Sequence, residues 1–243
     1  MIVPVQENLP TALDDIGVGI ALRKGGSALI KINLARPPEP GHPRTDPDLL
    51  MEVIRYISHS GACCAIAEAA DGFLRQNIES IGLDRVVDEH SVVVLDLDQG
   101  DFDCVTVGGE QHYLPRCLRD YAVRIGIPAT SKRPGMTFSN NVKLFVGAVP
   151  RRMYQIGEPT TWRPRVHADL HRSIAGIYRA VMQYAPFHCF VNGGKAMVEG
   201  QGEAVMPKVY VGDDALELDL HMLGRFSLEP PEYVKHLSAC EEL

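Results

Sequence analysis

A lysine, two amides and two hydroxyls interrupt an apolar stretch near the middle of the chain. The hydroxyls belong to Thr137 and Ser139, the amides to Asn140 and Asn141, and the lysine is Lys143. A lysine buried away from water costs several kcal/mol unless an anion meets it. Lys143 therefore either extends to the surface along its aliphatic stem or points into a polar cavity, where it would bind an anion.

Further cations and polar groups stand where strands are expected to end and helices to begin. Lys31 and Asn33 close an apolar run, Arg44 and Thr45 precede a helix, and a cationic pair lies at 151–152. Arginine offers a bidentate fork, lysine a compact charge, and the N–H groups of a helix N-terminus also bind anions. Together these groups could hold a phosphate, a sulfate or a carboxylate.

Two carboxylates, Glu68 and Asp71, follow a second apolar run and are candidates for a general base. Partial burial raises the pKa of a carboxylate toward neutral pH, which suits that role. We expect these two residues and the lysines Lys31 and Lys143 to be catalytic.

The residues expected to bind substrate are polar or positively charged. They are Asn33, His42, Arg44, Thr45, Thr137, Ser139, Asn140, Asn141, Arg151, Arg152, Asn192 and Lys195.

No metal and no cofactor are expected. The chain has neither a Gly-x-Gly-x-x-Gly motif after a strand nor a phosphate-binding loop, and its 6 cysteines show no Cys-x-x-Cys spacing. His167 and His171, one helical turn apart, leave metal binding or proton transfer open beside the simpler interpretation of a solvated helix face.

Alternating apolar runs and helical stripes must position these residues. Strands are predicted at 28–33, 62–67, 91–97, 122–127 and 187–191. Helices are predicted at 11–24, 73–81 and 166–184. A further helix, capped by Thr45, carries an apolar stripe from Leu49 to Ile57 and follows a loop at 36–44 rich in proline.

This alternation favours an α/β fold, with a mostly parallel or mixed sheet and helices on both faces. We expect a single domain over residues 1–243, with a possible sub-domain insertion around 98–165. Ligands of open α/β sheets bind outside the carboxyl ends of the strands. Lys31, Asn33, Glu68 and Asp71 fall at such ends, which favours one common site.

Four short blocks occur in an order that resembles a known family. They are Lys31-Ile32-Asn33, Arg44-Thr45-Asp46-Pro47, Asn192-Gly193-Gly194-Lys195 and Asp214-Ala215-Leu216-Glu217-Leu218-Asp219. From about Ala28 to Leu223 the chain resembles the domain of unknown function DUF362, sometimes fused to ferredoxin-like iron–sulfur modules. The absence of paired cysteines makes it similar to a divergent, stand-alone form of this domain.

The chain departs from the family pattern within these blocks. The family tends to have proline at the position of Ile32, asparagine at Leu144, aspartate at Asn192 and proline at Ala215. The lysines are kept, whereas a partner carboxylate and an amide are lost. This argues against a metal or general-base role at position 192 and leaves the cationic part of the site intact.

Composition limits the partners. Hydrophobic residues make up 45% and charged residues 23% of the 243 residues, as in soluble globular proteins, and the net charge of −7 argues against nucleic acid. No apolar run is long enough to span a bilayer, and the N-terminus lacks the regions of a signal peptide. We therefore expect a cytoplasmic protein without a membrane partner, which forms a homo- or hetero-oligomer with a paralogue and binds an anionic small-molecule substrate.

The expected function is that of a cofactor-independent enzyme in a biosynthetic pathway. Elimination or intramolecular displacement that expels sulfate or phosphate suits a cationic site, because the cations stabilise charge growing on the leaving group. Two alternatives stay open. The altered blocks indicate a non-catalytic accessory subunit that pairs with a more typical paralogue. A redox-associated protein is the other, which the lack of cluster-ligand cysteines argues against.

Overall fold

The computed structural model of the protein describes most of the chain. The described residues are 2–5, 8–37, 39, 42–132, 137–157, 163–198, 202–206 and 208–238. Positions 38, 40 and 41 of the proline-rich loop lie outside the described residues.

Within the described part of the chain, seven strands form one sheet in the order β1-β12-β9-β7-β2-β3-β4. These strands are β1 (Ile2–Val5), β2 (Ser27–Ile32), β3 (Cys63–Glu68), β4 (Val93–Asp96), β7 (Val123–Ile127), β9 (Cys189–Asn192) and β12 (Val209–Gly212). All neighbours from β9 to β4 pair in parallel, whereas β12 and β1 are antiparallel to their neighbours. The predicted α/β fold with a mixed, mostly parallel sheet is confirmed.

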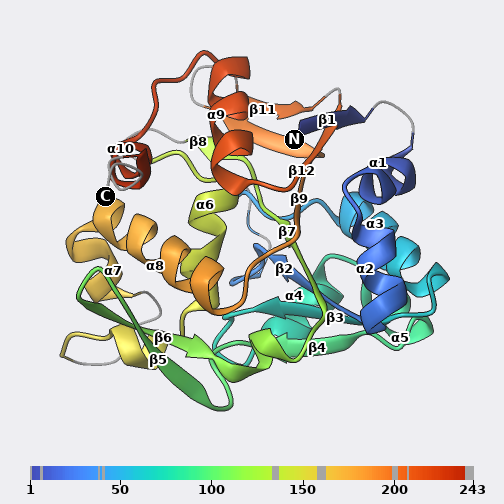
Figure 1. Ribbon diagram of the computed structural model, residues 1–243, viewed down its shortest axis with the longest axis horizontal. Helices are drawn as coiled ribbons and strands as arrows, with labels where there is room; N and C mark the ends of the chain where they lie inside the picture. Colours follow the sequence, from blue (N-terminus) through green and yellow to red (C-terminus); the bar gives the residue numbers. More distant parts are fainter. Residues whose placement is uncertain are drawn as a thin grey trace.

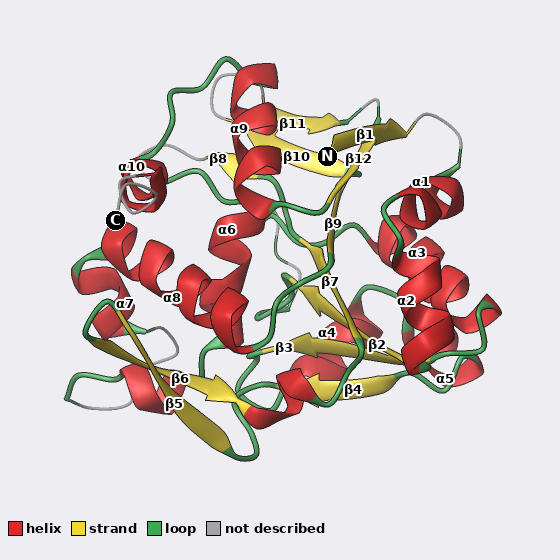
Figure 2. Cartoon of the chain, in the orientation of Figure 1, coloured by secondary structure: helices red, strands yellow, loops and turns green. Residues whose placement is uncertain are grey.

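Helices cover both faces of this sheet (Figures 1 and 2). One face carries α1 (Leu9–Asp15), α2 (Val18–Gly25), α3 (Pro47–His59), α4 (Leu74–Ser80) and α5 (Asp84–Glu89). The other carries α6 (Asn141–Leu144), α7 (Pro164–Ala168), α8 (Leu170–Tyr184), α9 (Ala215–Arg225) and α10 (Glu232–Ser238). Among the described residues, 3-10 turns lie at η1 (Arg116–Arg119), η2 (Phe145–Ala148) and η3 (Arg151–Tyr154).

Strand β2 shows how the two faces divide. Ala28, Ile30 and Ile32 pack with the apolar residues of α3, whereas Leu29 belongs to the core beneath α8. Lys31 lies two residues after Leu29, so its side chain is on the same face of the sheet, and it is fully buried. The sequence pattern therefore places an ammonium group inside the core, where it needs a counter-charge.

Helix α3 confirms the predicted apolar stripe, because every residue of that stripe is buried. The predicted cap is wrong by one residue. The Asp46 carboxylate, not Thr45, accepts from the N–H groups of Asp48 and Leu49, at 3.1 Å each. Thr45 is buried, and its hydroxyl donates to Ile127 O at 2.6 Å, so tertiary contacts occupy the group that would otherwise cap the helix.

Two helices predicted as continuous are each broken. The first divides at Gly17, whose φ of +85° is a left-handed conformation that glycine tolerates. The second divides at Asp169, whose carboxylate accepts from Arg172 N at 3.3 Å and caps α8.

The break at Asp169 also separates the two histidines. The ring of His167, in α7, hydrogen-bonds Arg163 O at 2.8 Å, whereas His171, in α8, stacks on Tyr233 with ring centroids 6.1 Å apart. They therefore do not share one face of a continuous helix. The described residues contain no group of three or more histidine, cysteine or acidic side chains arranged to hold a metal ion.

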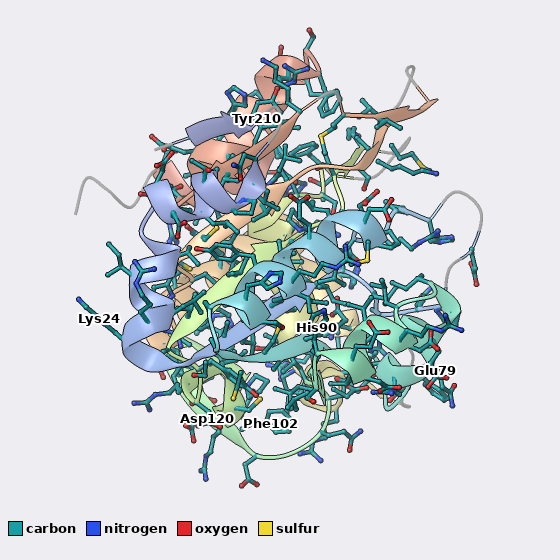
Figure 3. All side chains as sticks on the ribbon, turned by 90° about the vertical axis from the view of Figure 1, so that its right-hand side faces the viewer. Lys24, Glu79, His90, Phe102, Asp120 and Tyr210 are labelled. Carbon is teal, nitrogen blue, oxygen red and sulfur yellow. The ribbon has the colours of Figure 1, made fainter. Side chains whose placement is uncertain are left out.

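The remaining strands lie outside the main sheet. A hairpin joins β5 (Phe102–Val107) to β6 (Glu110–Pro115), and a small sheet joins β8 (Ser131–Lys132), β10 (Lys195–Val198) and β11 (Gly202–Val205). Figure 3 shows Phe102 of the hairpin and Tyr210 of β12 at opposite ends of the molecule. The stretch around 98–165 contains this hairpin but also the central strand β7. None of the described helices is both long and apolar enough to cross a membrane.

Candidate functional site

A cavity of about 330 Å³ lies beyond the carboxyl ends of the neighbouring parallel strands β2 and β7. It is lined by Asn33, Leu34, Ala35, Arg36, Pro37, His42, Pro43, Arg44, Ser131, Thr137, Ser139 and Lys143. We call it the cationic cavity. Six residues predicted to form the site line it, namely Asn33, His42, Arg44, Thr137, Ser139 and Lys143.

Hydrogen bonds join the chain segments that surround the cationic cavity. Asn33 N donates to Thr45 Oγ1 at 2.8 Å, and Thr45 N donates to Asn33 O at 3.0 Å, so the two ends of the proline-rich loop are joined. Ser131 and Ser139 exchange backbone hydrogen bonds of 2.7 and 2.8 Å, which hold Ser139 beside β8. Thr45, predicted to bind substrate, thus serves as a brace for the loop.

The lining is positively charged. Arg36, Arg44 and Lys143 contribute cations, and the described residues that line the cavity include no carboxylate. Arg44 Nε and Thr137 Oγ1 are buried and have no hydrogen-bond partner among the described residues. Because buried polar groups without partners cost stability, an anion that accepts from both would be bound favourably.

A second cavity of about 250 Å³ adjoins the first through His42, Pro43 and Arg44, which line both. Lys195 lines this second cavity rather than the cationic one. The His42 ring is half-exposed, and its Nδ1 lies 3.3 Å from Glu39 Oε2. A carboxylate beside one ring nitrogen orients a histidine, which suits a group that accepts a proton at its other nitrogen.

Lys31 and Glu68 form an ion pair inside the core, instead of lining the cavity. Lys31 Nζ lies 3.1 Å from Glu68 Oε2 and donates to Ile32 O at 2.7 Å, and both side chains are almost completely buried. Glu68 also accepts from Ala69 N at 2.9 Å and from Leu34 N at 3.2 Å. Since Leu34 lines the cavity, this pair supports the cavity wall from behind. Lys31 and Glu68 were expected to contact substrate directly, but neither residue lines the cavity.

Burial governs the titration of this pair. Burial lowers the pKa of Lys31 and raises the pKa of Glu68, while the attraction between the two charges opposes both shifts. Arg163, itself buried, favours the ionised form of Glu68. Burial lowers the pKa of Arg163, and the charges of Asp98 and Glu68 oppose that shift.

Neither residue of the cationic pair 151–152 lines the cavity, although Arg151 donates to the carbonyl oxygen of the lining residue Ala35 at 3.4 Å. Arg151 is buried, its Nε lies 3.6 Å from Asp98 Oδ2, and a terminal nitrogen donates to Ala69 O at 3.0 Å. Another terminal nitrogen lies 3.6 Å from Asp71 Oδ2, so this predicted base is engaged in an ion pair. Arg152 donates to Gly100 O at 3.1 Å and covers the Phe102 ring.

Three further predicted residues belong to a buried polar network. Asn141 and Asn192 hydrogen-bond each other through their amides at 2.8 and 3.2 Å. Asp219 accepts from Asn141 N at 2.8 Å and from Tyr233 Oη at 3.1 Å. The amide oxygen of the buried Asn140 accepts from a threonine hydroxyl of the core. Asn140, Asn141 and Asn192 are therefore structural supports of α6, the helix that carries Lys143.

Gly147 packs directly on the ion pair, which leads to a prediction. Gly147→Ala is expected to lower the free energy of unfolding by about 1–3 kcal/mol, because an added Cβ would clash with Glu68 Oε1 and lie 2.9 Å from Lys31 Nζ. Gly224→Ala in α9 is the matched control, since nothing lies within 4 Å of its added Cβ. Urea unfolding of both variants checks this prediction, and equal free energies of unfolding for the two variants would contradict it.

Several residues of the site are absent from the sequence prediction. Arg36 and Ser131 line the cavity without having been predicted, although Arg36 opens the proline-rich loop. Asp98 and Asp219 are buried partners of predicted residues. For Asp219 a signal existed, because it lies on the apolar stripe of α9 with Ala215 and Met222.

Comparison with protein-family models gives a match that covers most of the chain. The family model described as Domain of unknown function (DUF362) matches residues 28–223, which include every residue that lines the cationic cavity. A search of the curated proteins finds no match to the chain.

Proposed function

This chain belongs to the DUF362 family, and from that premise we propose that it is a cofactor-independent enzyme whose cationic cavity binds an anionic small molecule. The family description specifies no activity, so the proposal depends on the cavity itself. The observation that carries it is the set of Arg36, Arg44 and Lys143 around a space with no carboxylate among its described lining residues.

The reaction we propose is the expulsion of an oxyanion, sulfate or phosphate, by elimination or intramolecular displacement. In either case the bond from carbon to the ester oxygen breaks, and the electron pair leaves with that oxygen. Arg44 and Lys143 would stabilise the charge that grows on the departing group. His42, oriented by Glu39, would accept the proton released from the adjacent carbon or from the attacking nucleophile.

Anion binding is the first test. Lys143→Met is expected to weaken binding of inorganic sulfate or phosphate about tenfold or more, since it removes a charge from a partly desolvated site. Arg44→Met should act in the same direction. Lys24→Met is the control, because Lys24 is exposed at the end of α2 (Figure 3). Isothermal titration calorimetry measures the anion affinity of all three variants. Wild-type affinity in the Lys143 and Arg44 variants would contradict the proposal.

Turnover is the second test. Release of sulfate or phosphate from a panel of small sulfate and phosphate esters is expected to fall about 10²–10³-fold in Lys143→Met. His42→Gln should lower kcat more than it weakens anion binding, because its role is in proton transfer.

An accessory subunit is the second candidate, and one observation favours it. The described residues lining the cationic cavity supply no carboxylate base, and a cavity that only binds needs none. Anion binding without turnover of any ester, together with co-elution with a family paralogue in size-exclusion chromatography, would support this candidate over the enzyme.

A further inference from the structure

A separate cavity of about 400 Å³ lies where the hairpin β5–β6 packs against α8. It is lined by Gly109, Glu110, Gln111, His112, Tyr154, Arg165, Ser173 and Ile177. We call it the hairpin cavity. It shares no lining residue with the cationic cavity, so a ligand bound there would be independent of the proposed function.

His112 is the unusual residue of the hairpin cavity. It is only 4% exposed, yet neither of its ring nitrogens has a hydrogen-bond partner among the described residues. Its ring packs on α8 at Gly176, where an added Cβ would lie 3.1 Å from the ring carbon Cε1. A neutral imidazole offers one donor and one acceptor, and leaving both unpaired in the protein interior costs stability.

Two charged residues, Glu110 and Arg165, line the cavity near the ring and differ in their contacts. Glu110 is paired with Arg172, whose terminal nitrogen lies 2.6 Å from a Glu110 oxygen. Arg165 faces the Tyr154 ring, with its guanidinium carbon 6.0 Å from the ring centroid, and donates to Met153 O at 3.2 Å. Neither of these contacts neutralises the Arg165 guanidinium, so its charge can attract an anion.

The protonation of His112 agrees with this arrangement. Burial lowers the pKa of His112, and the charge of Glu110 only partly opposes the shift. The ring is therefore neutral at physiological pH and keeps both hydrogen-bonding functions.

We infer that the hairpin cavity binds a small carboxylate that also carries a hydroxyl group. The carboxylate faces Arg165, and the hydroxyl pairs with one ring nitrogen of His112, as donor or as acceptor according to the tautomer. The hydroxyl of Ser173 supplies a further polar contact at the same cavity. A purely structural role does not explain a histidine at this position, because an apolar ring could pack there without unpaired nitrogens.

Nuclear magnetic resonance of protein labelled with ¹⁵N-histidine tests the inference. The ring signals of His112 are assigned by their loss in His112→Phe, and three probes are compared: glycerate, acetate and glycerol. Glycerate is expected to shift these signals saturably at millimolar concentration, and acetate and glycerol to shift them far less. Arg165→Met should weaken the response to glycerate. Equal responses to all three probes, or no saturable response to glycerate, would overturn the inference.

Thermal unfolding gives an independent readout. His112→Phe is expected to raise Tm of the ligand-free protein by about 2–4 °C, because it removes two unpaired polar groups and keeps a flat aromatic ring. His188→Phe is the matched control and should lower Tm, since His188 Nδ1 accepts from Arg124 N at 3.2 Å. A lower Tm for His112→Phe would show that the ring is satisfied without a ligand and would reject the site.

Discussion

Glu68→Ala is expected to lower the free energy of unfolding by about 3–5 kcal/mol, because it leaves Lys31 charged and alone in the core. The side chain of Lys31 is 0% exposed and that of Glu68 is 3% exposed, so water cannot replace the lost partner. The N–H groups of Leu34 and Ala69 would also lose their acceptor. Lys31→Met should lower the free energy of unfolding by a similar amount, since it removes the nearest counter-charge of the buried carboxylate.

The double variant Lys31→Met/Glu68→Gln separates charge pairing from packing. It removes both charges and keeps an amide oxygen that can accept from Leu34 N or Ala69 N. Its loss of stability should be smaller than that of either single variant, by about 2 kcal/mol or more, because no isolated charge remains in the core. Urea unfolding monitored by circular dichroism measures the full cycle.

The exposed ion pair Arg75–Asp88 is the matched control. Its nitrogen and oxygen lie 2.6 Å apart, closer than those of the buried pair, but its side chains are 44% and 66% exposed. Asp88→Ala is therefore expected to cost less than about 1 kcal/mol. Losses of the same size for Glu68→Ala and Asp88→Ala would mean that burial does not determine the contribution of these pairs.

Asp219→Ala is expected to lower the free energy of unfolding by about 3 kcal/mol or more, because several buried donors lose their acceptor at once. Asp219 accepts from Asn141 N at 2.8 Å, from Val142 N at 3.3 Å and from the Tyr233 hydroxyl at 3.1 Å. The first two donors are the N-terminus of α6, so the variant should also weaken anion binding at Lys143. Asp219→Asn retains the shape and one acceptor oxygen, and its loss should be smaller.

The same carboxyl makes the stability of the protein depend on pH. Burial raises the pKa of Asp219 to about 7, and the hydrogen bonds from Val142 and Asn141 only partly oppose this shift. Between the ordinary aspartate pKa of about 4 and pH 7, the folded protein holds a proton that the unfolded chain has released. This contribution to stability is therefore complete below about pH 4 and is lost as the pH rises through 7.

Asp219→Asn removes this titration and is the comparison that isolates it. From pH 5 to pH 8, the wild type should lose about 2–3 kcal/mol of stability relative to Asp219→Asn. Urea unfolding of both proteins at several pH values checks the difference. Parallel stability profiles across that range would contradict a carboxyl that titrates near neutrality.

The sequence alone was enough to predict the five parallel strands of the main sheet and the apolar face of α3, but not the antiparallel strands β1 and β12. The five predicted strands agree with β2, β3, β4, β7 and β9 to within two residues at each end. Local patterns suffice here, because a β-branched run or a helical stripe must be buried whichever residues cover it. The same patterns missed the breaks at Gly17 and Asp169, where one residue's backbone conformation overrides the periodicity around it.

The residues around the cationic cavity were also found in part from the sequence. Asn33 and Arg44 are polar or charged residues next to the ends of predicted elements, and the carboxyl ends of parallel strands meet at one edge of a sheet. Lys143 was found because it interrupts an apolar stretch. That rule is general, so it locates a site without locating each side chain in it.

Only the tertiary structure decided which polar residues line the cavity and which lie in the core. Lys31 and Lys143 look alike in the sequence, since each is a lysine within an apolar run. Gly147 of η2 covers Lys31 and excludes water from it, whereas Lys143 lies on a short helix that borders the cavity. The difference arises because the environment of a charge depends on elements distant in the sequence, and a local pattern contains no information about what packs above it.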